Sequence, residues 1–111
     1  MLRRNALFAL TLFSIAIVMV ITGCQPSAAS LIESGDANFA SKNYDQAIAD
    51  YTKAIDIDSE SAVAYASRGR AYYNEEMYDE ALADLNKAIE LDPNSYTAYF
   101  RRGYAYTLQT L

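Results

Sequence analysis

The chain has 111 residues, with 9 Lys and Arg against 14 Asp and Glu, which gives a net charge of -5. This length allows one small domain, and the acidic balance excludes a general nucleic-acid binder, because phosphate neutralisation needs clustered Lys and Arg. With no His and a single Cys, the chain can form neither an imidazole-based catalytic or metal site nor an internal disulfide.

The N-terminal segment 1–23 has the pattern of a secretory signal. Arg3 and Arg4 precede the run 6–22, which carries no charge and is near the lower length limit for a spanning helix. The run ends at Ile21-Thr22-Gly23-Cys24, which resembles a bacterial lipobox. This resemblance implies removal of residues 1–23 as a lipoprotein signal peptide, after the Cys24 thiol has received diacylglycerol. The alternative is an uncut membrane anchor in which Cys24 is a chance residue.

Lipoprotein processing would fix the protein to a membrane without a spanning helix. Residues 24–27 would form the lipidated N-terminus and a short linker, and each methylene of the acyl chains (palmitate, for example) would contribute about 0.8 kcal/mol to membrane binding. Gln25 stands where inner-membrane lipoproteins of Gram-negative bacteria usually have Asp, which favours the outer membrane if the source has one. The expected location is the bacterial cell envelope. The lipid on Cys24 is the one non-protein group expected, with no separate cofactor and no metal.

The rest of the chain repeats itself with a period of 34 residues, marked by Gly35, Gly69 and Gly103. Within each period the apolar residues have helical spacing, and polar breaks at 41–43, 58–61, 74–76 and 92–95 separate the segments. Each period therefore predicts two antiparallel helices. Further pairs keep the same offset: Tyr44 and Tyr78, Asp45 and Asp79, Ala47 and Ala81, Asp50 and Asp84, Lys53 and Lys87, Ala54 and Ala88, Ile55 and Ile89, Asp58 and Asp92.

The three glycines need a packing reason, because glycine within a helix costs about 1 kcal/mol relative to alanine. We expect each of Gly35, Gly69 and Gly103 to let a neighbouring helix approach closely. The acidic residues fall mainly on the second helices and the connecting loops. Such charges usually mark a solvated outer face, so we expect them to be exposed.

These offsets resemble those of tetratricopeptide repeats (TPRs). The resemblance implies an all-α, helix-turn-helix solenoid of about two and a half repeats, with five helices after the signal peptide. Residues 28–61 form the first repeat, which departs from the pattern at Leu31, Asn38 and Ser59. Residues 96–111 supply only the first helix of a third repeat. The second repeat, 62–95, matches at Tyr65, Gly69, Tyr72, Ala81, Leu85, Ala88 and Pro93.

The segment 96–111 has no partner helix following it in this sequence. We expect it to cap the preceding helix through Tyr99 and Tyr106, which leaves Phe100, Tyr104 and Leu108 uncovered. Three interpretations remain open: a cap whose aromatic residues bind a ligand, pairing with a second copy of the chain, and a truncated remnant of a longer array.

In the TPR family the first helices line a groove that receives an extended peptide or a partner helix. A subclass clamps a C-terminal carboxylate with Lys and Asn, a set that Ile32, Asp36, Ala66 and Arg70 do not supply, so we do not expect this clamp. Carried over by position, the candidate groove residues are Asp36 and Phe39 of the first repeat, Arg70, Tyr73 and Asn74 of the second, and Phe100 and Tyr104 of the third. Val63 and Ala66 lie at neighbouring groove positions.

The groove would have aromatic walls and an opposite-charge pair, Asp36 and Arg70, which favours an apolar peptide with an acidic group near Arg70. The alternative is that Arg70 is a solvated helix residue paired with Asp36 or Glu33, and that the aromatic rings are ordinary repeat packing. Arg68, Arg101 and Arg102 are expected to lie along the helix surface rather than to contact a ligand.

Catalytic patterns are lacking in the sequence, which contains no Gly-rich phosphate loop, no Ser-centred elbow and no Cys-x-x-Cys pair. The sequence therefore predicts a non-catalytic protein- or peptide-binding scaffold or adaptor, anchored by lipid at the bacterial envelope. Its alternative is a self-associating structural module or a truncated array. By analogy, similar lipoproteins assist envelope assembly, secretion or pilus biogenesis.

Overall fold

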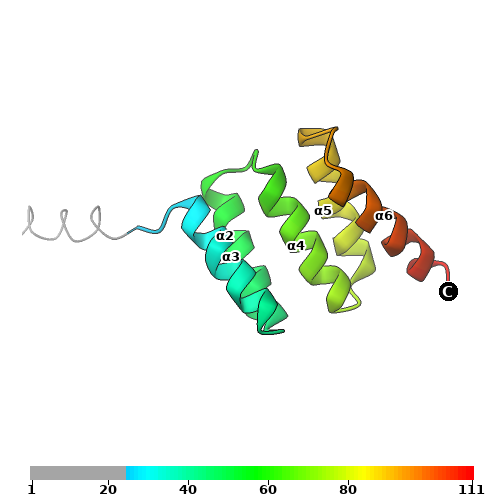
Figure 1. Cartoon of the computed structure of the whole chain (residues 1–111), viewed down its shortest axis with the longest axis horizontal. Coiled ribbons are helices and arrows are strands. Elements are labelled where there is room, and N and C mark those ends of the chain that lie inside the picture. Colours follow the sequence, from blue (N-terminus) through cyan, green and yellow to red (C-terminus); the bar gives the residue numbers. More distant parts are fainter. Residues whose placement is uncertain (1–24) are drawn as a thin grey trace, which may run out of the picture.

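The computed structural model describes residues 25–111, so the signal segment and Cys24 lie outside the described residues. Every regular element in this range is a helix, which confirms the all-α prediction. Figure 1 shows α2 folding back on α3, α4 on α5, and α6 closing the described chain. The helices are α2 (Ala28–Ala40), α3 (Tyr44–Ile57), α4 (Ala62–Asn74), α5 (Tyr78–Leu91) and α6 (Tyr96–Gln109). None of them combines the length and apolarity that a membrane-spanning helix needs.

The equivalence between repeats includes the residues that cap the helices and form the turns. Serine precedes each first helix at Ser27, Ser61 and Ser95, and its hydroxyl accepts a hydrogen bond from a backbone N–H in the first turn. The turns inside the two helical pairs are also equivalent, because Lys42 and Glu76 both have a positive φ, at 60° and 62°. One helix-turn-helix unit is thus built twice and then begun a third time.

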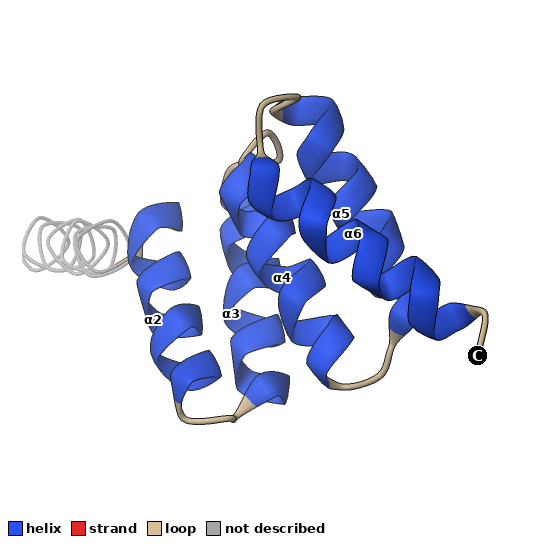
Figure 2. Ribbon diagram, turned by 45° about the vertical axis from the view of Figure 1, so that its right-hand side comes forward, coloured by secondary structure: helices blue, strands red, loops and turns tan. Residues whose placement is uncertain are grey.

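The first helices of the repeats lie on the inner side of the stack. α4 contacts both α2 and α6, whereas α3 and α5 do not contact each other. Figures 1 and 2 show the helical pairs arranged side by side along the stack. The layer of α2, α4 and α6 is therefore the side toward which the solenoid curves, and it is called the inner layer below.

Two of the three repeat glycines allow close helix packing, as predicted. A Cβ atom added to Gly35 would lie 2.5 Å from Cε1 of Tyr51, and one added to Gly69 would lie 3.0 Å from Cγ of Leu85. The prediction was wrong for Gly103, where an added Cβ would meet nothing within 4 Å. In the first two repeats the second helix covers the glycine, and no helix of the described chain lies in that place on α6.

The core consists of small and medium side chains between successive helices. One cluster joins Leu31, Ala54, Ile55 and Ala64, and a second joins Ala47, Tyr51 and Ala71. α6 packs on α5 and buries Ala98 and Ala105, which lie one period after Ala64 and Ala71.

The sequence predicted that α6 caps α5 through Tyr99 and Tyr106, and both side chains remain about half exposed in the structure. Their exposed fractions are 42% and 49%. Both tyrosines lie on the Gly103 side of α6, which corresponds to the side of α4 that receives a second helix.

Two aspartates expected on the solvated outer face are buried instead. Asp50 accepts hydrogen bonds from Ser34, Asn38 and Gln46. Burial opposes ionisation of Asp50, but these three hydrogen bonds and the charge of Lys53 together outweigh it, so that the pKa of Asp50 is lowered. The equivalent Asp84 is buried as well. The repeat therefore places a carboxylate between its two helices, facing the first helix.

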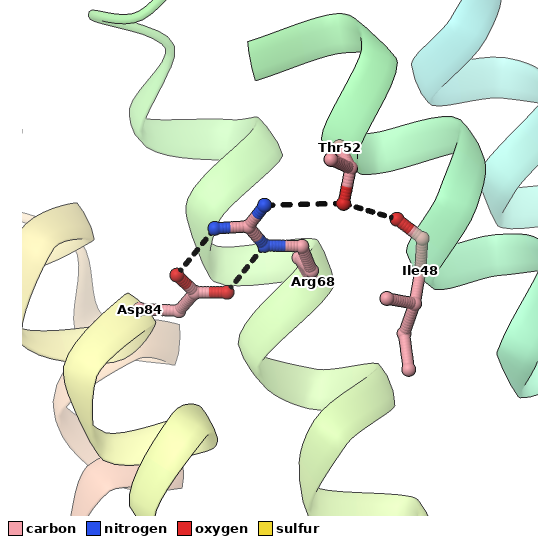
Figure 3. A network of polar contacts seen from close by, with 4 residues as sticks. All are labelled: Ile48, Thr52, Arg68 and Asp84. Carbon is pink, nitrogen blue, oxygen red and sulfur yellow. Dashed lines mark hydrogen bonds and ion pairs between the residues drawn. The ribbon is translucent and has the colours of Figure 1, made fainter. Parts of the chain in front are cut away.

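Arg68 is the partner of Asp84, which corrects the expectation that this arginine lies along the surface. Its Nε and Nη2 atoms donate to the two carboxylate oxygens of Asp84, at 2.7 and 2.9 Å. Its Nη1 atom donates to Oγ1 of Thr52 on α3, at 3.1 Å (Figure 3). Thr52 in turn donates to the carbonyl oxygen of Ile48. Arg68 thus joins α3, α4 and α5, and the hydrogen bonds to Asp84 raise its pKa.

Candidate functional site

A hollow of about 200 Å³ opens between α4 and α6 on the inner layer. Its apolar wall comes from α4, and two arginines, Arg70 of α4 and Arg101 of α6, line it together. The remaining polar lining comes from α4 and from the turn that precedes α6. The full lining is Ala62, Val63, Ala66, Ser67, Arg70, Asp92, Ser95 and Arg101.

Contacts with α2 hold the Arg70 guanidinium in place. Its Cζ atom lies 3.8 Å from the centre of the Phe39 ring, and its Nη2 atom donates to Oδ1 of Asp36 at 3.4 Å. Tyr51 donates its hydroxyl hydrogen to the same Asp36 oxygen, at 2.6 Å. Arg70 is therefore positioned across two repeats, rather than moving freely in solvent.

Arg70 keeps N–H donors that its contact with Asp36 does not use. The Nε atom is buried and has no hydrogen-bond partner among the described residues. A buried donor without a partner carries a desolvation cost that a bound acceptor would remove. The weak Asp36 contact occupies only Nη2.

The two arginines give the hollow a positive character. Both arginines line it, and burial, followed by the charge of Arg70, lowers the pKa of Arg101. Asp92 at the rim accepts a hydrogen bond from the backbone N–H of Asn94, within its own turn. Tyr51 is fully buried, and burial together with Asp36 raises its pKa to about 12, so it remains a neutral donor.

The structure brings together three of the predicted groove residues, Asp36, Phe39 and Arg70, of which only Arg70 lines the hollow. Two others lie at the end of α4 and do not line the hollow. Tyr73 packs edge-to-face on Tyr78, with ring centres 5.8 Å apart. Asn74 donates its side-chain N–H to the carbonyl oxygen of Arg70, at 2.8 Å.

The other two predicted residues, Phe100 and Tyr104, lie on α6, and their side chains are outside what the structure describes. Arg101 was predicted from the sequence to lie along the helix surface rather than to contact a ligand, and in the structure it lines the hollow. Arg101 follows Ser67 by 34 residues, and the structure shows that these two equivalent positions line the hollow from α6 and α4.

Comparison with known proteins identifies the fold family. The sequence model of the tetratricopeptide repeat matches residues 62–95, and a related TPR repeat model matches residues 35–76. A solved structure, the second TPR of Spaghetti (RPAP3) bound to the HSP90 peptide SRMEEVD, is 36% identical, with a TM-score of 0.74; the match covers 76% of this chain and 78% of that one. The chain belongs to the tetratricopeptide repeat family.

Two further TPR structures are similar to this chain. The second TPR domain of human RPAP3, in complex with the HSP70 peptide SGPTIEEVD, is 36% identical over 75% of this chain and 69% of that one, with a TM-score of 0.72. The TPR domain of Arabidopsis OM64 is 28% identical over 76% of this chain and 69% of that one, with a TM-score of 0.75. Among curated protein sequences no relative was found. TPR modules of this kind are protein-interaction folds, so the family supports a protein-binding role.

Proposed function

We propose that this protein is a non-catalytic scaffold that binds an extended segment of a partner protein on the inner layer of α2, α4 and α6. The observation that carries the proposal is the hollow whose lining combines the apolar Val63 and Ala66 with the two arginines Arg70 and Arg101. Arginine beside an apolar surface is typical of binding hot spots. The two similar RPAP3 structures, which are complexes with an HSP90 and an HSP70 peptide, support a peptide as the occupant.

The side chains that line the hollow indicate which kind of peptide would bind there. A carboxylate entering it would meet two guanidiniums, and it could accept from the buried Nε–H of Arg70. Apolar side chains next to the carboxylate would cover Val63 and Ala66. We therefore propose an extended peptide with an Asp or Glu flanked by apolar residues, held without the Lys and Asn clamp of the family.

Selection from a phage library of random short peptides tests this function on the full-length protein in lipid nanodiscs. Enriched peptides should carry an acidic residue next to apolar ones. Arg101→Gln should lower the affinity for a selected peptide by about tenfold, because the substitution removes a charged hydrogen-bond donor. Lys53→Gln, on the exposed surface of α3, removes the same charge and should leave the affinity unchanged. Enrichment of peptides without acidic residues, or equal binding by the Arg101 variant, would contradict the proposed site.

We further propose that the scaffold is a lipoprotein of the bacterial cell envelope, anchored through Cys24. Support comes from the lipobox pattern Ile21-Thr22-Gly23-Cys24 and from the charge-free run before it. Acyl chains would keep the groove close to a membrane and raise the effective concentration of partners there.

Metabolic labelling with an alkyne analogue of palmitate tests the anchor in a bacterial host. The natural chain should be labelled and should fractionate with membranes, whereas Cys24→Ser should lose the label and keep its N-terminal segment. A matched control combines Cys24→Ser with Ser41→Cys, which restores a thiol at an exposed site outside the lipobox. Labelling of this control, or retention of label in Cys24→Ser, would count against the anchor.

A further inference from the structure

The three helices of the inner layer differ in charge. α2 carries Glu33 and Asp36 and no Lys or Arg, whereas α4 and α6 each carry two arginines and no Asp or Glu. Because α4 contacts both α2 and α6, the positive lining of the hollow, Arg70 and Arg101, lies next to an acidic helix. A peptide that crosses the inner layer from α6 to α2 would therefore pass from positive side chains to negative ones.

The carboxylate of Asp36 is held on one side and exposed on the other. Its Oδ1 atom accepts hydrogen bonds from the hydroxyl of the fully buried Tyr51, at 2.6 Å, and from Nη2 of Arg70, at 3.4 Å. Within residues 25–111 both of its hydrogen bonds end on Oδ1, and the side chain is 52% exposed. The Oδ2 atom can therefore accept a hydrogen bond from a ligand.

Arg70 pairs with Asp36 only weakly. Their single contact is 3.4 Å long, whereas Arg68 and Asp84 form two hydrogen bonds at 2.7 and 2.9 Å. The Arg70 guanidinium lies 3.8 Å from the centre of the Phe39 ring and keeps its Nε–H without a partner in the described chain. The inner layer thus holds two opposite charges next to each other, and each keeps capacity for a further partner.

We propose that Asp36 is a second charged subsite of the inner layer, which binds a lysine or arginine of the same peptide whose acidic residue enters the hollow. This inference rests on the proposed function and adds the charge pattern of the partner segment. Side chains two residues apart in an extended peptide project to the same side, about 7 Å apart. A Glu and a Lys at this spacing can therefore reach Arg70 and Asp36 together.

The same carboxylate selects against a second acidic residue. A peptide with Asp or Glu in place of the lysine would bring a negative charge to Asp36, where like charges repel. Glu33 lies three residues before Asp36 on the same exposed side of α2 and adds to the negative charge there. The expected partner segment therefore carries one acidic and one basic residue among apolar ones.

Short capped peptides test the subsite by fluorescence anisotropy on the full-length protein in phosphatidylcholine nanodiscs. The probes are AVEVKVA and AVKVEVA, which present the two charges in both orders, and their counterparts with glutamine in place of lysine. All carry the same dye. The lysine peptide of the preferred order should bind about threefold more tightly than its glutamine counterpart, as expected for a half-exposed ion pair. High salt should reduce this preference.

Asp36→Asn separates a direct contact from a role in holding Arg70. The asparagine oxygen can still accept from Tyr51, but the charge is lost, so the variant should bind the lysine and glutamine peptides equally. Asp56→Asn removes the same charge from the exposed surface of α3 and should keep the threefold preference. If Asp36 served only to position Arg70, Asp36→Asn would change the affinity for both peptides by the same factor.

The outcomes distinguish this inference from the proposed function. Equal binding of the lysine and glutamine peptides by the natural protein, or a preference that persists in Asp36→Asn, would overturn the Asp36 subsite and leave the hollow as the binding site. Absence of binding by both lysine peptides, while peptides selected from the phage library bind, would overturn the subsite as well. Binding that survives replacement of the peptide glutamate by glutamine would instead contradict the proposed function, and the subsite with it.

Discussion

Replacing Asp84 by alanine is expected to lower the free energy of unfolding by about 3 kcal/mol, the largest loss we predict for a single side chain. The substitution would leave the Arg68 guanidinium without its carboxylate between α3, α4 and α5, where the arginine side chain is only 17% exposed. A buried charge that loses its partner keeps its desolvation cost without the compensating hydrogen bonds. Urea unfolding followed by circular dichroism measures the loss.

The exposed pair Lys87 and Glu90 provides the matched control. These side chains are 39% and 71% exposed, so Glu90→Ala should change stability by at most about 0.5 kcal/mol. Combining Asp84→Leu with Arg68→Met should recover much of the loss, because the two charges leave the interior together. An Asp84→Ala protein as stable as Glu90→Ala would show that the Arg68 contact does not hold the repeats together.

Alanine is expected to have opposite effects at two equivalent glycines. At Gly35 the new methyl group would lie 2.5 Å from the fully buried ring of Tyr51, which cannot move aside easily, so a loss of about 2 kcal/mol is expected. At Gly103 the methyl group meets open space, and the better helix propensity of alanine should add about 1 kcal/mol.

Thermal and urea unfolding of both variants, in the same lipid environment as the natural chain, measures this contrast. Tyr51→Leu in the Gly35→Ala background serves as a control, since a more compliant side chain should relieve part of the overlap. Equal destabilisation at Gly35 and Gly103 would contradict an open face on α6.

The sequence was sufficient to predict the fold because its period coincides with one structural unit. The period places a glycine at the same position of each first helix, and polar breaks separate one helix from the next. These two features predict the number, order and direction of the helices without any knowledge of tertiary contacts. The same period could not show that Asp50 and Asp84 are buried. Their donors differ between repeats, with Ser34 and Asn38 in one and Arg68 in the other, so no shared pair of residues marks the interaction.

The candidate site was only partly predictable for a related reason. Asp36, Phe39 and Arg70 were predicted to lie together because equivalent groove positions follow directly from the repeat register, and they are in contact, although only Arg70 lines the hollow. Arg101 depends on how far α6 is rotated and shifted relative to α4, which is a property of helix packing and not of spacing along one helix. The exposure of Tyr99 likewise follows from α6 packing on α5 through alanines, which an aromatic-based pattern overlooks.

The most direct test of binding on the inner layer is to follow the arginine side-chain Nε–H resonances by NMR while a selected acidic peptide is added. The Nε–H signals of Arg70 and Arg101 should move downfield as they donate to the peptide carboxylate. The Arg68 signal should stay in place, because its Nε–H already donates to Asp84. Saturable peptide binding that leaves the Arg70 and Arg101 signals unmoved would contradict the assignment of this hollow as the binding site.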